Sequence, residues 1–248
     1  MNYTLLTGAT SSIGKEIAIT LSKSNKLILM GRNENELAKL KGLCFNPNNH
    51  FTYIIDFNDI DLLRVDFIEF IKLKTIKIEN IIHCAGMMKV MHMKHVDLKN
   101  TNQIFKVNVF SIIEIISILL NKRVNDNCLK NIIFISAILA KYGSTGHHLY
   151  SSTKAALDGL MRSLAVELAP NTRVNSILPG AVETKMSKEL LSNKDMYNKL
   201  SNDYPLGIGK PKQISPIVKF LLSNDDSSWI TGQELIVDGG RTININNK

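Results

Sequence analysis

Seven short apolar runs, separated by longer stretches of helical spacing, constrain the fold of this chain more than any other feature. The runs are predicted strands: YTLLT (3–7), KLILM (26–30), FTYII (51–55), NIIHCA (80–85), NIIFIS (131–136), RVNSIL (173–178) and ELIVD (234–238). Five stretches between them carry apolar residues at the spacing of one helix face: 13–24, 35–43, 62–73, 103–122 and 151–168. Strands with few polar interruptions are expected where helices cover both faces of a parallel sheet. The alternation predicts an α/β fold with a doubly wound parallel β-sheet.

The chain shows no linker rich in proline or serine, no internal repeat and no low-complexity segment. We therefore expect one domain over residues 1–248. Residues 185–212 differ from the rest because they are polar and weakly periodic, with PLGIG before Pro211. A mobile lid over a ligand and an ordinary surface insertion both fit this segment.

The formal net charge of +8 raises the question of a nucleic-acid or membrane partner. The lysines are spread along the whole chain and not gathered in one stretch, so we expect neither partner. A cofactor that carries phosphate would also suit a basic cleft.

The three cysteines, Cys44, Cys84 and Cys128, are isolated and lack the spacing of metal ligands. We expect no metal site, and scattered thiols favour a reducing, cytoplasmic compartment. We expect no signal peptide before the first strand. The apolar run 109–120 is too short to span a bilayer and carries Glu114, so it is predicted to be a buried helix.

The first predicted strand runs directly into TGATSSIG (7–14) and then into a helix. A strand, a glycine turn and a helix in the first βαβ unit place backbone N–H groups and a helix N-terminus where a pyrophosphate binds. Gly8 allows the tight turn, and Gly14 allows close packing of the helix. The turn predicts a dinucleotide site on a Rossmann fold.

The second predicted strand ends in MGRN, with Arg32 and no acidic residue before Glu34. An acid at this place would hold a ribose 2′-hydroxyl, whereas a guanidinium binds a 2′-phosphate through a fork of charged hydrogen bonds. Arg32 therefore favours NADP(H) over NAD(H). The alternative is a surface arginine beside a helix cap.

Tyr150 and Lys154 stand four residues apart at the start of a predicted helix, and so lie on one face of it. A phenol has a reference pKa of about 10. An adjacent ammonium favours the phenolate, so we expect Lys154 to lower the pKa of Tyr150 and to fit it for acid–base catalysis.

Together, the glycine turn and the Tyr-x-x-x-Lys pair resemble the short-chain dehydrogenase/reductase family over nearly the whole chain. TGATSSIG is similar to the family's TGxxxGxG turn, with Ser12 at the middle glycine, where its hydroxyl can donate to a phosphate. Within the family, PLGIGKPKQISPIVKFLLS and ITGQELIVDGG (230–240) look most like the 3-oxoacyl-[acyl-carrier-protein] reductases.

The resemblance implies roles for further residues. Asn108 in KVNV matches a helix asparagine of a proton relay, Asp56 an acid near the adenine, and Thr184 in PGAVETKM (179–186) a contact of the nicotinamide amide. HCAG (83–86) stands where NNAG is usual, and we expect His83 to satisfy local backbone groups without a part in catalysis. The residues expected at the cofactor are Gly8, Thr10, Ser11, Ser12, Ile13, Gly14, Arg32, Asp56, Phe57, Cys84, Ala85, Gly86, Tyr150, Lys154, Pro179, Gly180, Val182 and Thr184.

A serine that binds the substrate carbonyl stands thirteen residues before the tyrosine in the family, and this position is Ala137. Ser136 directly precedes it, and strand alternation aims its side chain the other way. Either the loop carries an extra residue and Ser136 serves, or the site lacks this serine, which is the reading we favour. Loss of one such donor costs on the order of 10²–10³ in rate. Ser144 or Thr145 are possible substitutes.

The resemblance implies an oxidoreductase that reduces a carbonyl to a secondary alcohol with NADPH. Tyr150 would give the proton, Lys154 would hold the nicotinamide ribose, and Asn108 and Ser136 complete the candidate catalytic set. The favoured substrate is a 3-oxoacyl thioester of fatty acid biosynthesis, for which acyl-carrier protein would be the carrier, near Lys122 and Arg123. A modified sugar, a steroid-like ketone or a small secondary alcohol would need the same core residues. A homo-oligomer is also implied, either a dimer or a homotetramer.

The alternative hypothesis is a sensor or scaffold that keeps nucleotide binding and has weakened catalysis. Ala137, Ser12 and His83 all depart from the family pattern in a way that fits this reading. The presence of Tyr150, Lys154 and Asn108 argues against it, because a non-catalytic nucleotide binder has less need of all three.

Overall fold

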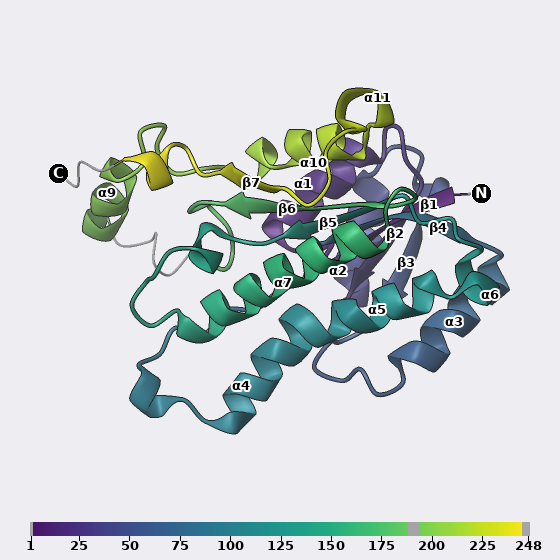
Figure 1. Cartoon of the computed structure of the whole chain (residues 1–248), viewed down its shortest axis with the longest axis horizontal. Helices are drawn as coiled ribbons and strands as arrows, with labels where there is room; N and C mark the ends of the chain where they lie inside the picture. The colour runs from purple at the N-terminus through teal and green to yellow at the C-terminus, as the bar shows by residue number, and fades with distance from the viewer. Residues whose placement is uncertain (1, 188–193, 245–248) are drawn as a thin grey trace.

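The computed structural model describes residues 2–187 and 194–244, and its strands form one parallel sheet (Figure 1). The strands are β1 (Asn2–Thr7), β2 (Leu27–Gly31), β3 (Phe51–Ile54), β4 (Lys77–His83), β5 (Asn131–Ile135), β6 (Arg173–Pro179) and β7 (Glu234–Val237). Their order is β3-β2-β1-β4-β5-β6-β7, so the direction of winding reverses between β1 and β4. The predicted doubly wound sheet is confirmed. A crevice for ligands is expected at this reversal, outside the carboxyl ends of the strands.

Helices cover both faces of the sheet because each strand alternates its buried side chains between them. On one face, Leu6 and Leu29 pack with α1 (Ser12–Leu21), α2 (Glu34–Leu43) and α10 (Ser215–Leu222). On the other, Leu5 and Phe134 pack with α3 (Leu63–Lys74), α5 (Ser111–Leu120) and α7 (His148–Glu167). Figure 1 shows α1 and α10 on one side of the strands and α7 on the other. Full burial of each such side chain contributes about 1.5–3 kcal/mol.

Side-chain caps start several of these helices where the sequence changes from strand to helix spacing. Ser11 accepts the N–H of Gly14 at the start of α1, and Asn33 accepts the N–H of Glu36 at the start of α2. Asp97 caps α4 (Leu98–Phe105) in the same way. These residues satisfy N–H groups that a helix leaves without an internal partner.

The predicted helix 103–122 is longer at its start than expected and carries a π-helical turn. Helix α4 continues through η3 (Lys106–Phe110) into α5, so that one helix extends over Leu98–Leu120. Its 23 residues are long and apolar enough to cross a membrane, a longer span than the run 109–120 alone, and half of the apolar window is buried in the protein. The buried part includes Ile112, Ile115 and Leu119, as predicted for a core helix.

The remaining elements are short and connect this framework. They are η1 (Pro47–Asn49), η2 (Met93–His95), α6 (Lys122–Asn125), η4 (Ile138–Ala140), α9 (Lys194–Asn202), η5 (Pro211–Gln213), α11 (Asn224–Ser227) and η6 (Arg241–Ile243). Within 185–212, residues 188–193 lie outside the described residues. The later part is tied to the chain after β6, since Val182 pairs with Gly209 and Tyr204 accepts the N–H of Ala181.

Candidate active site

The carboxyl ends of β1, β4 and β5 bring together most of the residues singled out in the sequence. Thr7, His83 and Phe134 lie side by side in the sheet register. The glycine turn follows Thr7, Cys84–Gly86 follow His83, and Ser136 follows β5. This is the edge of the sheet where α/β proteins bind nucleotides.

The glycine turn is closely packed, which explains why glycine stands at two of its positions. Gly8 has a φ of +61°, and a Cβ there would lie 2.6 Å from the Cα of Ala85. A Cβ on Gly14 would lie 2.3 Å from the carbonyl oxygen of Gly8. The turn therefore presents bare backbone at the N-terminus of α1, a cradle that fits a pyrophosphate.

Ser12 makes a contact that the sequence did not reveal. Its hydroxyl oxygen accepts the N–H of Lys185 at 3.0 Å. The Nζ of Lys185 also binds Glu36 Oε1 at 3.1 Å, and this hydrogen bond holds the pKa of Glu36 below its ordinary value. The serine thus connects the turn to the segment after β6, and its own hydroxyl proton stays available for a phosphate.

Tyr150 and Lys154 lie one turn apart on α7, with the Lys154 Nζ 5.6 Å from the centre of the tyrosine ring. Lys154 is buried, and its Nζ donates to the carbonyl of Ile135 at 2.8 Å. Burial lowers the pKa of Lys154 from 10.5 to about 8. A lysine held in this way carries a charge that is easily removed.

The prediction that Lys154 lowers the pKa of Tyr150 is wrong for this structure. Burial raises the pKa of the phenol well above its ordinary value of 10.0, and the neighbouring Cys84, when ionised, adds to the shift. Removal from water disfavours the charged phenolate. Tyr150 therefore keeps its proton at neutral pH, which is the state required of a proton donor.

Asn108 is fully buried in the π-helical turn and holds neighbouring elements with its side-chain amide. Its Oδ1 accepts the N–H of Met87 at 2.8 Å, and its Nδ2 donates to the Met87 carbonyl and to Thr153 Oγ1. A Cβ on Gly86 would lie 3.5 Å from Lys154 Nζ and 3.6 Å from Asn108 Oδ1. The lysine and the asparagine thus meet at the glycine.

Ser136 points to α7, where its hydroxyl donates to Asp158 Oδ2 at 3.1 Å and lies 3.4 Å from the Lys154 carbonyl. Ala137 follows it, is buried, and has no side-chain donor. Ser144 hydrogen-bonds His147 Nδ1 at 3.0 Å, and Thr145 is exposed. This placement favours the reading in which the carbonyl-binding serine is missing.

The residues expected near the adenosine lie at the ends of β2 and β3. Arg32 is exposed directly before Asn33, the N-cap of α2. Asp56 is exposed and accepts both N–H and Nδ2–H of Asn58, whereas the ring of Phe57 is buried in the core. Arg32 and Asp56 are therefore open to a ligand, and Phe57 offers only its backbone.

The segment after β6 is held by its own contacts. A Cβ on Gly180 would lie 2.7 Å from the Tyr204 ring, and Val182 is buried. The N–H of Thr184 donates to Ser187, and the hydroxyls of the two residues lie 3.2 Å apart. With the Lys185 contact to Ser12, these bonds place the segment beside the glycine turn.

Sequence analysis missed two residues that connect the site. Thr153 accepts from Asn108 and donates to the Tyr150 carbonyl at 2.8 Å, and its position directly before Lys154 was the available signal. His83 contacts the side chain of Thr7 as well as the backbone carbonyl of Asn108 that the prediction allowed for. Nothing in the sequence predicted the hydrogen bond between His83 and Thr7.

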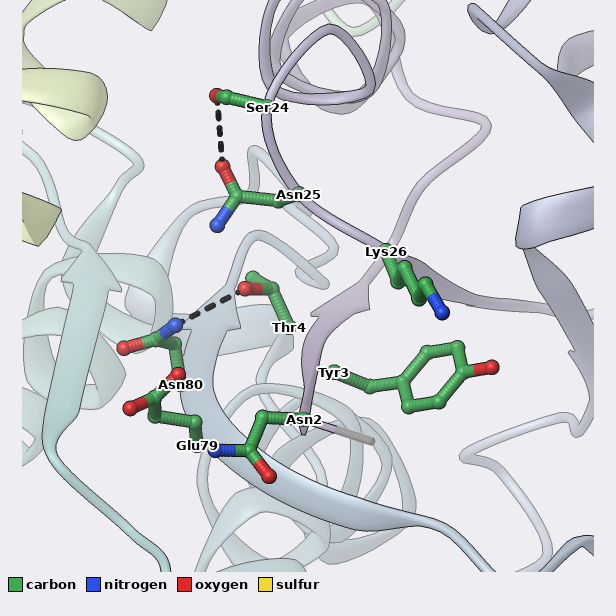
Figure 2. Close-up of a pocket in the computed structure, with 8 residues that line it drawn as sticks. All are labelled: Asn2, Tyr3, Thr4, Ser24, Asn25, Lys26, Glu79 and Asn80. Carbon is green, nitrogen blue, oxygen red and sulfur yellow. Dashed lines mark hydrogen bonds between the residues drawn. The ribbon is translucent and has the colours of Figure 1, made fainter.

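A pocket of about 320 Å³ lies elsewhere, at the amino ends of β1 and β4 (Figure 2). Polar residues such as Asn2, Ser24 and Asn80 line it. It lies at the opposite end of the strands from Tyr150 and Lys154. Among the described residues, no group of three histidine, cysteine or acidic side chains could hold a metal ion.

The chain matches a family model and two relatives over nearly its whole length. The family model described as enoyl-(acyl carrier protein) reductase matches residues 8–242. The 3-oxoacyl-[acyl-carrier-protein] reductase of Thermotoga maritima is 30% identical, over 96% of this chain and 97% of that protein. The enzyme of the same name from Buchnera aphidicola subsp. Baizongia pistaciae is 33% identical over 95% of both chains.

The fold also matches a solved structure of a short-chain dehydrogenase/reductase. The structure described as a short-chain dehydrogenase/reductase, glucose/ribitol dehydrogenase, from Brucella melitensis superposes with a TM-score of 0.87 and is 26% identical. The match covers 97% of this chain and 96% of that one.

Proposed function

The chain belongs to the short-chain dehydrogenase/reductase family of oxidoreductases, and we propose that it reduces a carbonyl to a secondary alcohol with NADPH. The observation that carries this proposal is the pair of half-buried Tyr150 and buried Lys154 on α7, beside Gly86 and the glycine turn. The proposal takes residues 1–248 as one catalytic domain.

The chain's own residues would hold the cofactor and move one proton. The backbone of the turn from Gly8 to Gly14 would bind the pyrophosphate, and Lys154 the nicotinamide ribose. When bound, the cofactor supplies a hydride to the carbonyl carbon. Tyr150 donates its phenol proton to the carbonyl oxygen, and the Lys154 ammonium stabilises the negative charge that remains on the phenol oxygen. Asn108 would support the return of a proton to this pair.

The preference for NADPH rests on Arg32. Its guanidinium is exposed at the end of β2, where it can pair with a 2′-phosphate. No acidic residue that would repel a phosphate lies between the start of β2 and Glu34. Asp56 would lie near the adenine. A relative that is 29% identical over 97% of this chain, from Thermoplasma acidophilum, is named L-rhamnose 1-dehydrogenase (NADP(+)).

We assign the substrate to the 3-oxoacyl thioesters, with acyl-carrier protein as the carrier and fatty acid biosynthesis as the setting. Two relatives that match 96% and 95% of this chain carry the name of this activity. Met87, Met88 and Met91 follow β4, and the N–H of Met91 binds the Gly146 carbonyl beside the start of α7. Methionines form an adaptable apolar wall that suits an acyl chain. Lys122 and Arg123 are exposed on α6 for an acidic carrier. The proposal includes a cytoplasmic homo-oligomer, a dimer or a tetramer.

One observation favours a second candidate function, a nucleotide sensor with weakened catalysis. The Ser136 hydroxyl is engaged by Asp158, and Ala137 offers no donor to a substrate oxygen. The reductase remains the first proposal because Tyr150 can itself donate to this oxygen.

The test is NADPH oxidation with acetoacetyl-CoA by the native chain, Tyr150→Phe and Ala137→Ser. A reductase turns over, loses activity in Tyr150→Phe and gains it in Ala137→Ser. A native chain that binds NADPH without turnover, while Ala137→Ser is active, supports the sensor. Equal rates with NADPH and NADH would contradict the role of Arg32, and Arg32→Ala is the matched variant.

A further inference from the structure

A buried histidine joins the end of one strand to the middle of the longest helix. His83 ends β4 and is completely inaccessible to solvent. Its Nδ1 lies 2.9 Å from Thr7 Oγ1, and its Nε2 lies 3.1 Å from the backbone carbonyl oxygen of Asn108. One imidazole therefore contacts both the residue before the glycine turn and the asparagine beside Lys154.

The partners define the tautomer of this imidazole. A carbonyl oxygen only accepts, so the proton must be on Nε2, and Nδ1 must accept the Thr7 hydroxyl proton. Thr7 Oγ1 in turn accepts the N–H of Ala85 at 3.2 Å. In this row of hydrogen bonds, from the Ala85 N–H through Thr7 and His83 to the Asn108 carbonyl, every donor has one acceptor. Burial, together with the charge of Lys154, lowers the pKa of His83 to about 3, so the ring stays neutral and the pattern persists at neutral pH.

The Asn108 end of the bridge lies where the helix is irregular. The π-helical turn Lys106–Phe110 interrupts the regular pattern of backbone hydrogen bonds in the helix, and such turns are frequent at functional sites. The hydrogen bond from His83 adds a tertiary contact to the backbone at this turn. It therefore defines where Asn108 lies relative to the sheet.

Asn108 is connected by hydrogen bonds to the residues next to the reacting groups. Its amide binds both backbone groups of Met87, directly after Gly86, and it binds Thr153, which donates to the Tyr150 carbonyl. A shift of Asn108 would therefore move both the Met87 backbone after β4 and the start of α7, which carries Tyr150. A misplacement of about 1 Å at the reacting atoms can cost on the order of 10² in rate.

We infer that His83 is a positioning residue, whose neutral imidazole holds Asn108 and the Ala85 amide in the arrangement that turnover requires. Both ring nitrogens hydrogen-bond to Thr7 and Asn108 and not to Tyr150 or Lys154, so the imidazole takes no part in proton transfer. This inference rests on the proposed reductase function.

The chain offers a matched control in a second buried histidine. His50 is 1% exposed, its Nδ1 accepts the N–H of Leu27, and its Nε2 donates to the Phe45 carbonyl. It has the same tautomer and the same bridging role, but at the start of β2, at the other end of the sheet from Tyr150. Burial lowers its pKa as well. Substitution of either histidine removes the two hydrogen bonds of a buried imidazole.

The kinetic experiment compares His83→Leu, His83→Asn and His50→Leu, with NADPH and acetoacetyl-CoA, per folded molecule. We expect kcat of His83→Leu to fall about 10–100-fold with the KM for acetoacetyl-CoA within about twofold. His83→Asn should recover most of kcat, because its amide accepts from Thr7 and a water can fill the space next to the Asn108 carbonyl. His50→Leu should lose stability but keep kcat within about twofold. An unchanged kcat in His83→Leu, or an equal loss in His50→Leu, overturns the inference.

A spectroscopic experiment separates this inference from the proposed function. Nitrogen NMR of the labelled imidazole should show a proton on Nε2 and none on Nδ1, with no change between about pH 5 and pH 9. A proton on Nδ1, or titration in this range, contradicts the bridge whatever the activity. Absence of turnover with every carbonyl tested, together with the expected NMR pattern, contradicts the reductase and leaves the bridge as a structural contact, which overturns the positioning role.

Discussion

The two ends of the parallel sheet both bury polar side chains, but they differ in how these side chains are paired. At the amino ends, neutral side chains bind one another: the Asn80 amide donates to the Thr4 hydroxyl at 3.0 Å, a bond drawn in Figure 2, and the Asn131 amide donates to Asn80 at 2.8 Å. At the carboxyl ends, Lys154 is a buried cation with a backbone carbonyl as its hydrogen-bond acceptor. The amino end thus contributes to stability, while the carboxyl end keeps an unfavourable charge that catalysis can use.

Tyr150→Phe gives the largest expected effect and tests the carboxyl end. Removal of the phenol proton donor should reduce kcat about 10²–10⁴-fold, because general acid catalysis contributes this much. The thermal unfolding midpoint should change little, since the ring remains. NADPH oxidation and thermal unfolding of the same preparation measure both quantities. A variant that keeps native kcat would remove Tyr150 from the mechanism.

Asn80→Leu makes the corresponding change at the amino end. It leaves the Thr4 hydroxyl and the Asn131 amide without their partner, so the free energy of unfolding should fall by about 2–3 kcal/mol. Urea unfolding measures this loss, and kcat per folded molecule should not change. In the control, Thr4→Val and Asn131→Leu are added to Asn80→Leu, and much of the stability should return. A fall in kcat would show that the two ends are coupled.

Ala137→Ser sharpens the comparison by adding a donor at the carboxyl end. A hydroxyl at this position should face the substrate oxygen, because the side chain of Ser136 is turned to Asp158. We expect kcat to rise about tenfold, a part of what one donor to an oxyanion contributes. Ser136→Ala is the matched control and should leave kcat near the native value. A loss of activity in Ser136→Ala would return the catalytic role to Ser136.

Lys154→Met should give the smallest effect on stability, a gain of about 1 kcal/mol in the free energy of unfolding at pH 7, together with loss of turnover. The pKa of Lys154 is about 8 in the folded protein, below the ordinary lysine value of 10.5 that applies to the unfolded chain. Between pH 8 and pH 10.5 the unfolded chain therefore binds a proton that the folded protein has released. Native stability should therefore rise as the pH increases above 8, relative to the variant. Urea unfolding of both proteins at pH 7, 8 and 9 measures this difference, and an unchanged difference would contradict the shifted pKa.

Local pattern was sufficient to predict the fold and the central pair of the site. Apolar runs and helical spacing predicted the sheet, and Tyr150 and Lys154 are neighbours on a helix because they are four residues apart. The contacts that could not be predicted join distant positions: 173 residues separate Ser12 from Lys185, and 76 separate Thr7 from His83. The direction of the Tyr150 pKa shift was also missed, because burial raises this pKa and burial depends on the whole fold.

The π-helical turn at Lys106–Phe110 has a consequence for insertions and deletions in the gene. One residue advances an α-helix by about 100°, so a turn with an additional residue rotates the side chains of α4 by this angle relative to those of α5. Ile104 is buried on α4, and Ile112 and Ile115 are buried on α5. Deletion of Val107 would restore a regular helix and turn the buried side of α4 towards solvent. Most substitutions should be tolerated better in this turn than the loss of one codon.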